Sequence, residues 1–310
     1  MWVYILRRLT LLPLMVFAVS LITFSLGHYG PGDPVRVMMG NKYDSAAAER
    51  VRSELGLDRP FYVQYGEYMW GFVQGDFGES FRYVGQPVRD LIIPKMWVSA
   101  QLSIAAMIIS LGVGLPLGFH IAHKQGEWQD PAAVTIALVL MSIPIMVTVP
   151  ALLWVGSLKT VILPSWAGWG GFFDLRIVVP AITMGVPGIA GMTRLMRAST
   201  LDVLGQDFVR TAHSKGLGPI TVDRRHVLRN ASIPIVTILA FSLAGLIGGS
   251  FITERIMGIP GIGQFAVESI FNRDYPVIMA ITLIGAIAFV LANLLADIAY
   301  AFIDPRIRYR

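Results

Sequence analysis

Cysteine is absent from the 310 residues of this chain, which excludes disulfides, thiol catalysis and cysteine-ligated zinc. That absence leaves the redox compartment undecided. Charged residues are also scarce, at 15% of the chain, whereas apolar residues make up 55% and the mean hydropathy is +0.62. A soluble domain of this length could not bury so much apolar surface, so the composition indicates an integral membrane protein.

Motifs for catalysis and for energy conversion are missing as well. There is no H-E-x-x-H, no G-x-S-x-G and no phosphate-binding G-x-x-x-x-G-K-[ST]. The five histidines lie near the ends of apolar stretches or in loops, without the spacing of a metal site. They are His28, His120, His123, His213 and His226. We therefore predict no catalytic, metal or cofactor site in this chain.

Ion-coupled transporters usually place an ionisable side chain near the membrane midplane. The nearest candidates here are Glu254 and Asp297, both near the ends of apolar stretches, and a structural ion pair is the predicted role of Asp297. A pump, an intramembrane protease and a proton-coupled carrier are therefore weakly supported. A protein with several membrane spans and no energy-converting site is either a channel or takes its energy from a partner.

Six uncharged stretches are long enough to cross a bilayer, which takes about 20 apolar residues at about 1.5 Å rise each. They are Leu9–Leu26, Trp97–Ala122, Ala132–Leu158, Ile177–Thr193, Ala231–Thr253 and Tyr275–Ala296. The alternating pattern of barrel strands is missing, so the predicted fold class is an all-α membrane protein with six transmembrane helices. The fourth stretch is the shortest, and we expect its helix to continue through Arg194 and Arg197, whose side chains then extend toward the headgroups.

The first stretch has some features of a signal peptide, because Arg7 and Arg8 precede an apolar run. That run, Leu9–Leu26, is longer than a usual signal core, and no clear A-x-A cleavage site follows it. A retained first helix is the better interpretation.

The net charge of +5 follows the predicted topology and does not indicate a nucleic-acid partner. With the N-terminus inside, the cytoplasmic segments hold Arg7, Arg8, Lys124, Arg194, Arg197, Arg210, Lys215, Arg224, Arg225, Arg229, Arg306, Arg308 and Arg310. The short outer loops hold only Lys159, Arg176, Arg255 and Arg273. This bias predicts that both termini are cytoplasmic.

The predicted organisation has three parts: residues 1–27 with the first span, an outer segment at 28–96, and a five-helix core at 97–310 with a cytoplasmic loop at 197–230.

Within the outer segment, a turn at Gly30–Pro34 stops the first span, and a short helix runs from Ser45 through Leu55 to Gly56. An aromatic helix starts at Pro60 and ends near Gly75. We interpret this segment as an extracytoplasmic cap over the helix bundle. A helix that rests on lipid headgroups is the alternative.

The cytoplasmic loop holds a basic helix–turn–helix between two apolar stretches, Asp207 to Pro234. Asp207 is predicted to cap the first helix, Phe208 and Ala212 to share one face, and Gly216 to end it in a left-handed conformation. A second helix follows the turn at Gly218-Pro219, with Thr221 as the candidate cap. A polar helix between two membrane spans is usually there to contact something outside the membrane.

Small residues and prolines interrupt the spans, including Gly114-x-x-x-Gly118 in the second, and Pro144 and Pro150 in the third. The fourth span contains Gly185, Pro187, Gly188 and Gly191, and the fifth contains Gly245, Gly248 and Gly249. Helix packing is the favoured role, and lining a pore is the alternative.

Motifs along the whole chain resemble the B-type membrane permease of ABC importers for dipeptides and oligopeptides. They are Leu6-Arg7-Arg8-Leu9, Pro31-Gly32-Asp33-Pro34, Glu54–Pro60, Gly75-Asp76-Phe77-Gly78-Glu79-Ser80, Arg210-Thr211-Ala212, Lys215-Gly216-Leu217, Leu228-Arg229-Asn230-Ala231, Pro234, Pro260-Gly261-Ile262-Gly263, Arg273-Asp274-Tyr275-Pro276-Val277 and Asp304-Pro305-Arg306-Ile307-Arg308.

This resemblance implies a type I importer permease in the cell membrane of a prokaryote, with the first loop helix docked on an ATPase subunit. The residues implied in ATPase coupling are Asp207, Phe208, Arg210, Thr211, Ala212, Lys215, Gly216, Leu217, Arg229 and Asn230. Arg210-Thr211-Ala212 stands where the family's name-giving Glu-Ala-Ala would be.

The implied partners are a second, C-type permease, two ATPase subunits that bind ATP and Mg, an extracytoplasmic solute-binding protein, membrane lipid and a peptide substrate. Similar permeases serve glutathione, nickel chelates and some sugars, and nothing in the spans selects one solute or identifies the substrate path. A self-sufficient channel or carrier is the less favoured alternative.

Cysteines introduced one at a time into this cysteine-free chain test the topology. In intact cells, an impermeant thiol reagent should label Ser45→Cys or Glu67→Cys but not Lys215→Cys or Arg308→Cys, because only the first two positions lie outside. The reverse labelling pattern would overturn the predicted orientation.

Overall fold

The computed structural model describes residues 2–29, 34–39, 44–154 and 168–303, and these residues are mostly helical. The first half contains α1 (Trp2–Tyr29), α2 (Pro34–Met39), α3 (Ser45–Glu54), α4 (Phe61–Gln74), α5 (Val88–Ala122), α6 (Gln129–Ser142) and α7 (Ile145–Leu153). The second half contains η3 (Leu175–Ile177), α8 (Val178–Leu204), α9 (Asp207–Ser214), α10 (Pro219–Val222), the π-turn η4 (Asp223–Val227), α11 (Leu228–Ala231), α12 (Ile233–Gly248), α13 (Phe251–Met257), α14 (Ile262–Phe271) and α15 (Tyr275–Ile303).

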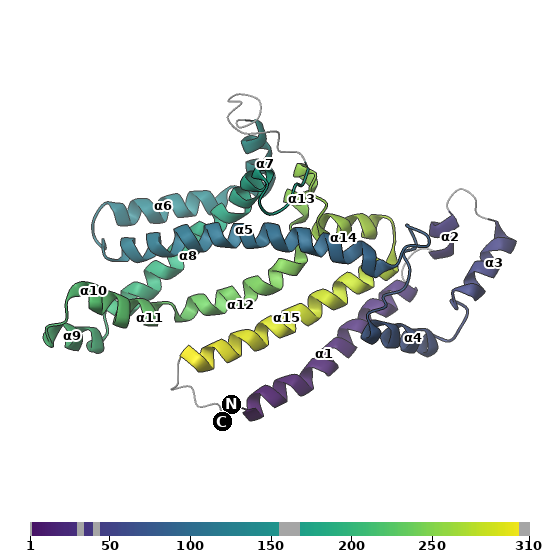
Figure 1. Cartoon of the computed structure of the whole chain (residues 1–310), viewed down its shortest axis with the longest axis horizontal. Coiled ribbons are helices and arrows are strands. Elements are labelled where there is room, and N and C mark those ends of the chain that lie inside the picture. The colour runs from purple at the N-terminus through teal and green to yellow at the C-terminus, as the bar shows by residue number, and fades with distance from the viewer. Residues whose placement is uncertain (1, 30–33, 40–43, 155–167, 304–310) are drawn as a thin grey trace. The chain divides into compact units, whose positions relative to one another are not determined.

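The chain divides into two compact units. Unit 1 comprises Met1–Ser99, Ile247–Phe251 and Pro260–Leu291. Unit 2 comprises Ala100–Leu246, Ile252–Ile259 and Ala292–Arg310. Figure 1 shows the helices of both units in chain order.

Among the described residues, three helical segments are long and apolar enough to cross a membrane by themselves: Val88–Ala122, Leu175–Leu204 and Tyr275–Leu295. Two further pairs of helices satisfy the same test together, although each pair is bent. The described chain therefore has three candidate spans, or five if each bent pair counts as one. In α1, the segment Pro13–Tyr29 is apolar but shorter.

The third apolar stretch is not the single helix that we expected over Ala132–Leu158. The axes of α6 and α7 meet at 91°, and residues 155–158 lie outside the described part. Pro144 causes the break, because a residue before proline is forced out of the helical region, and Ile143 is extended at φ −81° and ψ 117°. Pro150, in contrast, lies within α7 and does not interrupt it.

The fourth span confirms the expected continuation, since α8 runs on past Arg194 and Arg197 to Leu204. The fifth apolar stretch, Ala231–Thr253, was expected to be one helix, but α12 ends at Gly248 and α13 starts at Phe251. Gly249 lies between them at φ +64°, a left-handed conformation that stops a helix. The sequence analysis did not identify α14.

Glycines bring α5 and α8 together within unit 2. A Cβ on Gly114 would lie 2.7 Å from Cβ of Met192, and a Cβ on Gly118 would collide with the Thr193 carbonyl oxygen. Two hydrogen bonds cross the same contact: Thr193 Oγ1 donates to Gly114 O at 3.3 Å, and Ser110 Oγ donates to Gly185 O at 2.9 Å. The packing role is confirmed at this contact. It does not extend to Gly191 and Gly245, which have open space around them.

In unit 1, the predicted helices of the outer segment are present as α3 and α4, and Gly56 and Gly75 follow them with positive φ. The aromatic helix α4 packs on α1, as Figure 1 also shows. The ring centroids of Tyr65 and Phe24 lie 5.5 Å apart, and the Tyr65 hydroxyl is 2.7 Å from Ser20 Oγ. Trp70, on the same helix, is 69% exposed.

A buried carboxylate joins two other parts of unit 1. Asp274 precedes α15, and its Oδ2 accepts from Ser80 Oγ while its Oδ1 accepts from Phe81 N at 3.0 Å. Ser80 Oγ in turn accepts from Arg82 N and Tyr83 N. The 80–83 turn is therefore fixed to the start of α15, next to an apolar cluster that includes Val88 and Phe265.

Replacing Asp274 with Ala should lower the stability of the protein, because Ser80 and the Phe81 N–H lose their acceptor in a buried site. Each such buried group costs about 1–3 kcal/mol. Thermal unfolding of the purified protein in detergent measures the effect. Glu79→Ala, which removes an exposed carboxylate from the same turn, is the matched control. Equal melting temperatures for the two variants would show that the Asp274 contacts contribute nothing.

Candidate functional site

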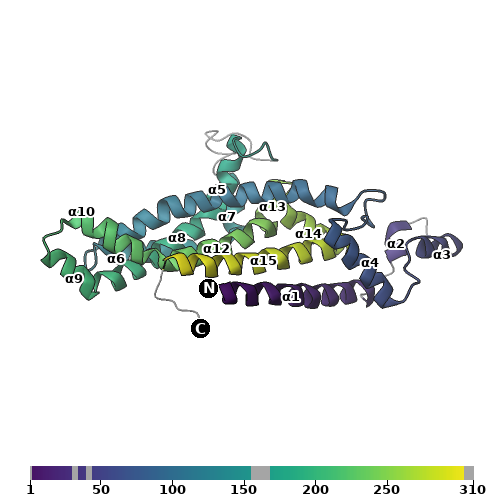
Figure 2. The same cartoon turned by 60° about the horizontal axis from the view of Figure 1, so that its bottom comes forward.

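The loop between α8 and α12, residues 205–231, is made of α9, α10, η4 and α11, and we call it the coupling segment after its predicted role. Figures 1 and 2 both show α9 and α10 beyond the ends of α6 and α8. Gly205 ends α8, and Gln206 then takes the extended conformation of an N-cap, with φ −78° and ψ 147°.

The predicted cap at Asp207 is wrong, because this residue is already the first helical residue of α9 and makes no capping hydrogen bond. Its charge still favours the positive end of the helix dipole. Its ion pair with Arg210 is 3.7 Å long and almost fully exposed, so it adds little stability. Thr211 Oγ1 donates back to Asp207 O at 2.9 Å, within the helix.

The predicted end of α9 at Gly216 is confirmed, with φ +78°. Leu217 N donates to Ala212 O at 3.3 Å, and Gly216 N donates to His213 O at 2.9 Å. These two bonds are the Schellman pattern, which satisfies the last carbonyls of the helix and needs a left-handed residue at this point. Lys215 is the residue just before the turn.

The second helix also starts differently from the prediction. Gly218 is the N-cap and Pro219 the first residue of α10, so Thr221 lies inside the helix. Proline suits this position because its fixed φ is helical and its missing N–H would have no partner there. Further on, Asn230 Nδ2 donates to His226 O at 2.6 Å, while Arg229 is exposed.

The coupling segment has an apolar core of its own. Val209, Ala212, Val222 and Val227 are buried together and pack against Phe119, Val203 and Leu204. The buried face of α9 is therefore formed by Val209 and Ala212, and the expected shared face of Phe208 and Ala212 is wrong. Phe208 points away from the core and is 42% exposed.

The outward side of the segment carries both apolar and basic groups. Its exposed residues include Phe208, Arg210, Thr211, Lys215, Leu217 and Ile220. Seven of the ten predicted coupling residues are exposed side chains of this segment: Asp207, Phe208, Arg210, Thr211, Lys215, Leu217 and Arg229. Ala212, in contrast, belongs to its core.

One ion pair and one His–Asp hydrogen bond join this region to the turn between α5 and α6. Arg197 on α8 donates from Nε and Nη2 to the carboxylate of Asp130, at 2.5 and 2.7 Å. The expectation that its side chain extends toward the headgroups is therefore wrong. Asp130 is only 6% exposed. His123 Nε2 lies 3.1 Å from Asp223 Oδ1. The sequence analysis missed Asp130 and Asp223. For Asp130 a signal was available, because this acid lies at the edge of an apolar stretch that contains no other charge.

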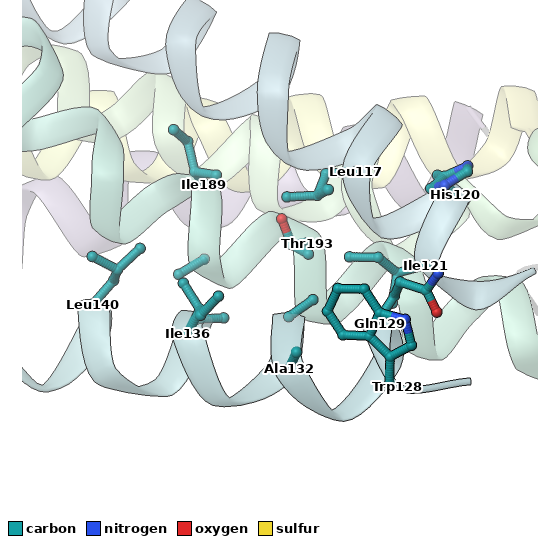
Figure 3. A pocket seen from close by; sticks show the side chains of 13 residues that line it. Leu117, His120, Ile121, Trp128, Gln129, Ala132, Ile136, Leu140, Ile189 and Thr193 are labelled. Carbon is teal, nitrogen blue, oxygen red and sulfur yellow. The ribbon is translucent and has the colours of Figure 1, made fainter. Parts of the chain in front are cut away.

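A cavity of about 350 Å³ lies between α5, α6 and α8 in unit 2. Figure 3 shows Leu140 and Ile136 toward one end, Trp128 and Gln129 toward the other, and Thr193 between them. The lining is mainly apolar, and His120 is its only titratable side chain. Such a cavity favours apolar groups and does not by itself define a substrate path.

Within the described residues, no three His, Asp or Glu side chains lie close enough together to hold a metal ion. Glu254 is fully buried on α13, and the side chain of Asp297 lies outside the described residues.

Residues 114–309 match the family described as the binding-protein-dependent transport system inner membrane component, and residues 1–89 match its N-terminal counterpart. The chain belongs to this family. It is therefore a multi-pass membrane subunit of a transport system, a class of subunit that is generally non-catalytic.

Full-length relatives support the same assignment. A probable peptide ABC transporter permease protein of Sinorhizobium fredii is 37% identical over 315 residues, covering 100% of both chains. The glutathione transport system permease protein GsiC of Escherichia coli K12 is 38% identical, covering 99% of both. The dipeptide transport system permease protein DppB of Alkalihalophilus pseudofirmus is 34% identical, covering 100% of both.

Among solved structures, the inward-facing MetNI methionine ABC transporter aligns with a TM-score of 0.52 and 17% identity, covering 69% of this chain and 96% of that one. At this identity the likeness concerns the fold alone. It supports the helical importer-permease fold that the motifs implied.

Replacing Gly216 with Val should loosen the coupling segment, because a β-branched residue is strained at positive φ by about 1 kcal/mol or more. A cost of about 1 kcal/mol raises the population of the opened segment about fivefold, since 1.4 kcal/mol is a factor of ten. Tryptic cleavage after Lys215 in the purified protein should therefore become about fivefold faster or more. Gly218→Val is the matched control, because Gly218 has an ordinary extended conformation and open space around it. Equal cleavage rates in both variants would contradict the strain argument.

Proposed function

We propose that this chain is a permease subunit of an ATP-driven importer in a prokaryotic cell membrane, and that it forms a translocation pathway for peptides with a second, C-type permease. Relatives named for peptide, dipeptide and glutathione transport align along its whole length. A solute-binding protein delivers the peptide, and two ATPase subunits bind ATP and Mg. Another small solute, such as a nickel chelate or a sugar, is the alternative within the family.

The coupling role is supported by the fact that α9 has one buried apolar face and one exposed face. Val209 and Ala212 anchor the helix in the chain's own core, so its outward side is held in place before any partner arrives. Exposed apolar side chains among basic ones are typical of a docking surface. We assign Phe208, Arg210 and Thr211 to the contact with the ATPase, together with Lys215 and Leu217.

In the proposed topology, six segments cross the membrane: the three straight spans, the bent α6–α7 pair, the fifth apolar stretch with α12, and α1. Both termini are then inside. The distribution of Lys and Arg supports this orientation. Residues 28–96 then lie outside as a cap. The packing of α4 on α1 leaves Trp70 exposed, so this face of α4 is the proposed place to receive the solute-binding protein.

Reconstitution tests the proposed division of labour. The purified chain alone in liposomes should neither hydrolyse ATP nor transport peptide, whereas the complex with the second permease, both ATPases and the solute-binding protein should do both. A self-sufficient channel or carrier would give peptide flux with the single chain, and that result would end the importer interpretation.

Two substitutions on α9 test the docking surface. Phe208→Ala and Arg210→Gln should each weaken binding of the ATPase subunit about fivefold or more, because a buried aromatic or arginine contact is worth more than about 1 kcal/mol. Affinity is measured by titrating the ATPase onto the permease pair in nanodiscs. Arg82→Gln, an exposed arginine of the outer segment, is the control. Arg210→Gln with unchanged affinity and coupling would mean that Arg210 only sets the topology.

A further inference from the structure

The turn between α5 and α6, residues 119–130, contacts the coupling segment and the end of α8 through three side chains of different chemistry. We propose that this turn moves as one body with the coupling segment and transmits ATPase-driven movement directly to α5 and α6. The proposal rests on the proposed function of α9. By chain connectivity alone, the segment would act only on α8 and α12.

The first contact is apolar. Phe119, on the last turns of α5, packs against the core of the coupling segment formed by Val209, Ala212, Val222 and Val227. The same side chain packs against a second cluster, in which Met196 of α8 is buried with Ala231 and Ile235. Phe119 therefore packs against both clusters, and a displacement of either cluster displaces the end of α5.

The second contact is polar and fixes the turn to η4. His123 Nδ1 lies 3.0 Å from Phe119 O, and its Nε2 lies 3.1 Å from Asp223 Oδ1. A backbone carbonyl and an ionised carboxylate only accept hydrogen bonds. Both ring nitrogens must therefore donate when both bonds are made, and the contact is then an ion pair with a fixed ring orientation.

The third contact joins the other end of the turn to α8. Asp130 lies in the first turn of α6, and each of its carboxylate oxygens accepts one hydrogen bond from Arg197. Such a bidentate pair resists rotation as well as separation. Because Asp130 is almost fully buried, loss of either partner leaves a charge without compensation, and the pair stays closed.

Together the contacts hold the turn at its start, its middle and its end. The first contact is made to the shared core of α9, α10 and η4, the second to Asp223 at the start of η4, and the third to α8. Rotation about one contact is blocked by the other two, so the turn and the coupling segment form one rigid body. The bend at Pro144 follows α6, which runs for 14 residues from Gln129 to Ser142, so the proposed rigid body ends at this bend.

Spin-label distances in the assembled importer test this rigid body, and the cysteine-free chain allows specific labelling. Labels at Gln125→Cys, in the turn, and Ser214→Cys, on α9, should keep the same distance in the nucleotide-free and vanadate-trapped states. The distance from Ser214→Cys to Glu67→Cys, in the outer segment, should change. A changed 125–214 distance overturns the proposal. An unchanged 67–214 distance instead means that α9 does not move, which contradicts the proposed function.

A functional test separates movement from simple structural support. Asp223→Asn together with Asp130→Asn should leave ATPase binding at its normal affinity, because the outward side of α9 is untouched. Peptide transported per ATP hydrolysed should fall about tenfold. Adding Arg197→Gln, which restores a neutral hydrogen-bonded pair with position 130, should recover part of that ratio. Asp202→Asn, an exposed acid on α8, is the matched control. An unchanged ratio in the double variant overturns the proposal, whatever its stability.

Discussion

The close approach of α5 and α8 is the contact on which the rest of unit 2 depends. Gly114 and Gly118 have no side chain to separate the helices, and a Cβ at either position would collide with α8. Between membrane helices there is little hydrophobic driving force, so close packing and interhelical hydrogen bonds supply the association. The hydrogen bonds of Thr193 and Ser110 across this contact follow from that proximity. Phe119, the residue after Gly118, packs against the coupling segment.

The coupling segment shows how a polar loop between membrane spans can present a defined surface. Its four helical pieces are too short to be stable alone, because a helix below about 12 residues is marginal in water. They persist because Val209, Ala212, Val222 and Val227 share one core. The Schellman bonds at Gly216 and the proline start of α10 fix the turn between them. A surface ordered in this way loses little entropy on binding a partner.

Several features of the fold were predictable from local rules. Gly56, Gly75 and Gly216 end their helices with positive φ, as glycine after a helix predicts. The rules failed where two of them competed. Asp207 is a good cap residue, but Gln206 already occupies the cap position after Gly205 ends α8. Pro144 and Pro150 look alike in sequence, yet only Pro144 follows a residue that left the helical region.

The sequence by itself determined the class of the protein, its apolar stretches, the missing phosphate-binding motif and the place of the polar loop at 205–231. Those properties depend on composition and on neighbours within a few residues, where spacing is a sufficient guide. Only the tertiary structure decided which face of α9 is buried, and that Arg197 meets Asp130, which lies 67 residues earlier. Pairings at such separations are set by how helices pack, and the periodicity of a single helix does not contain that information.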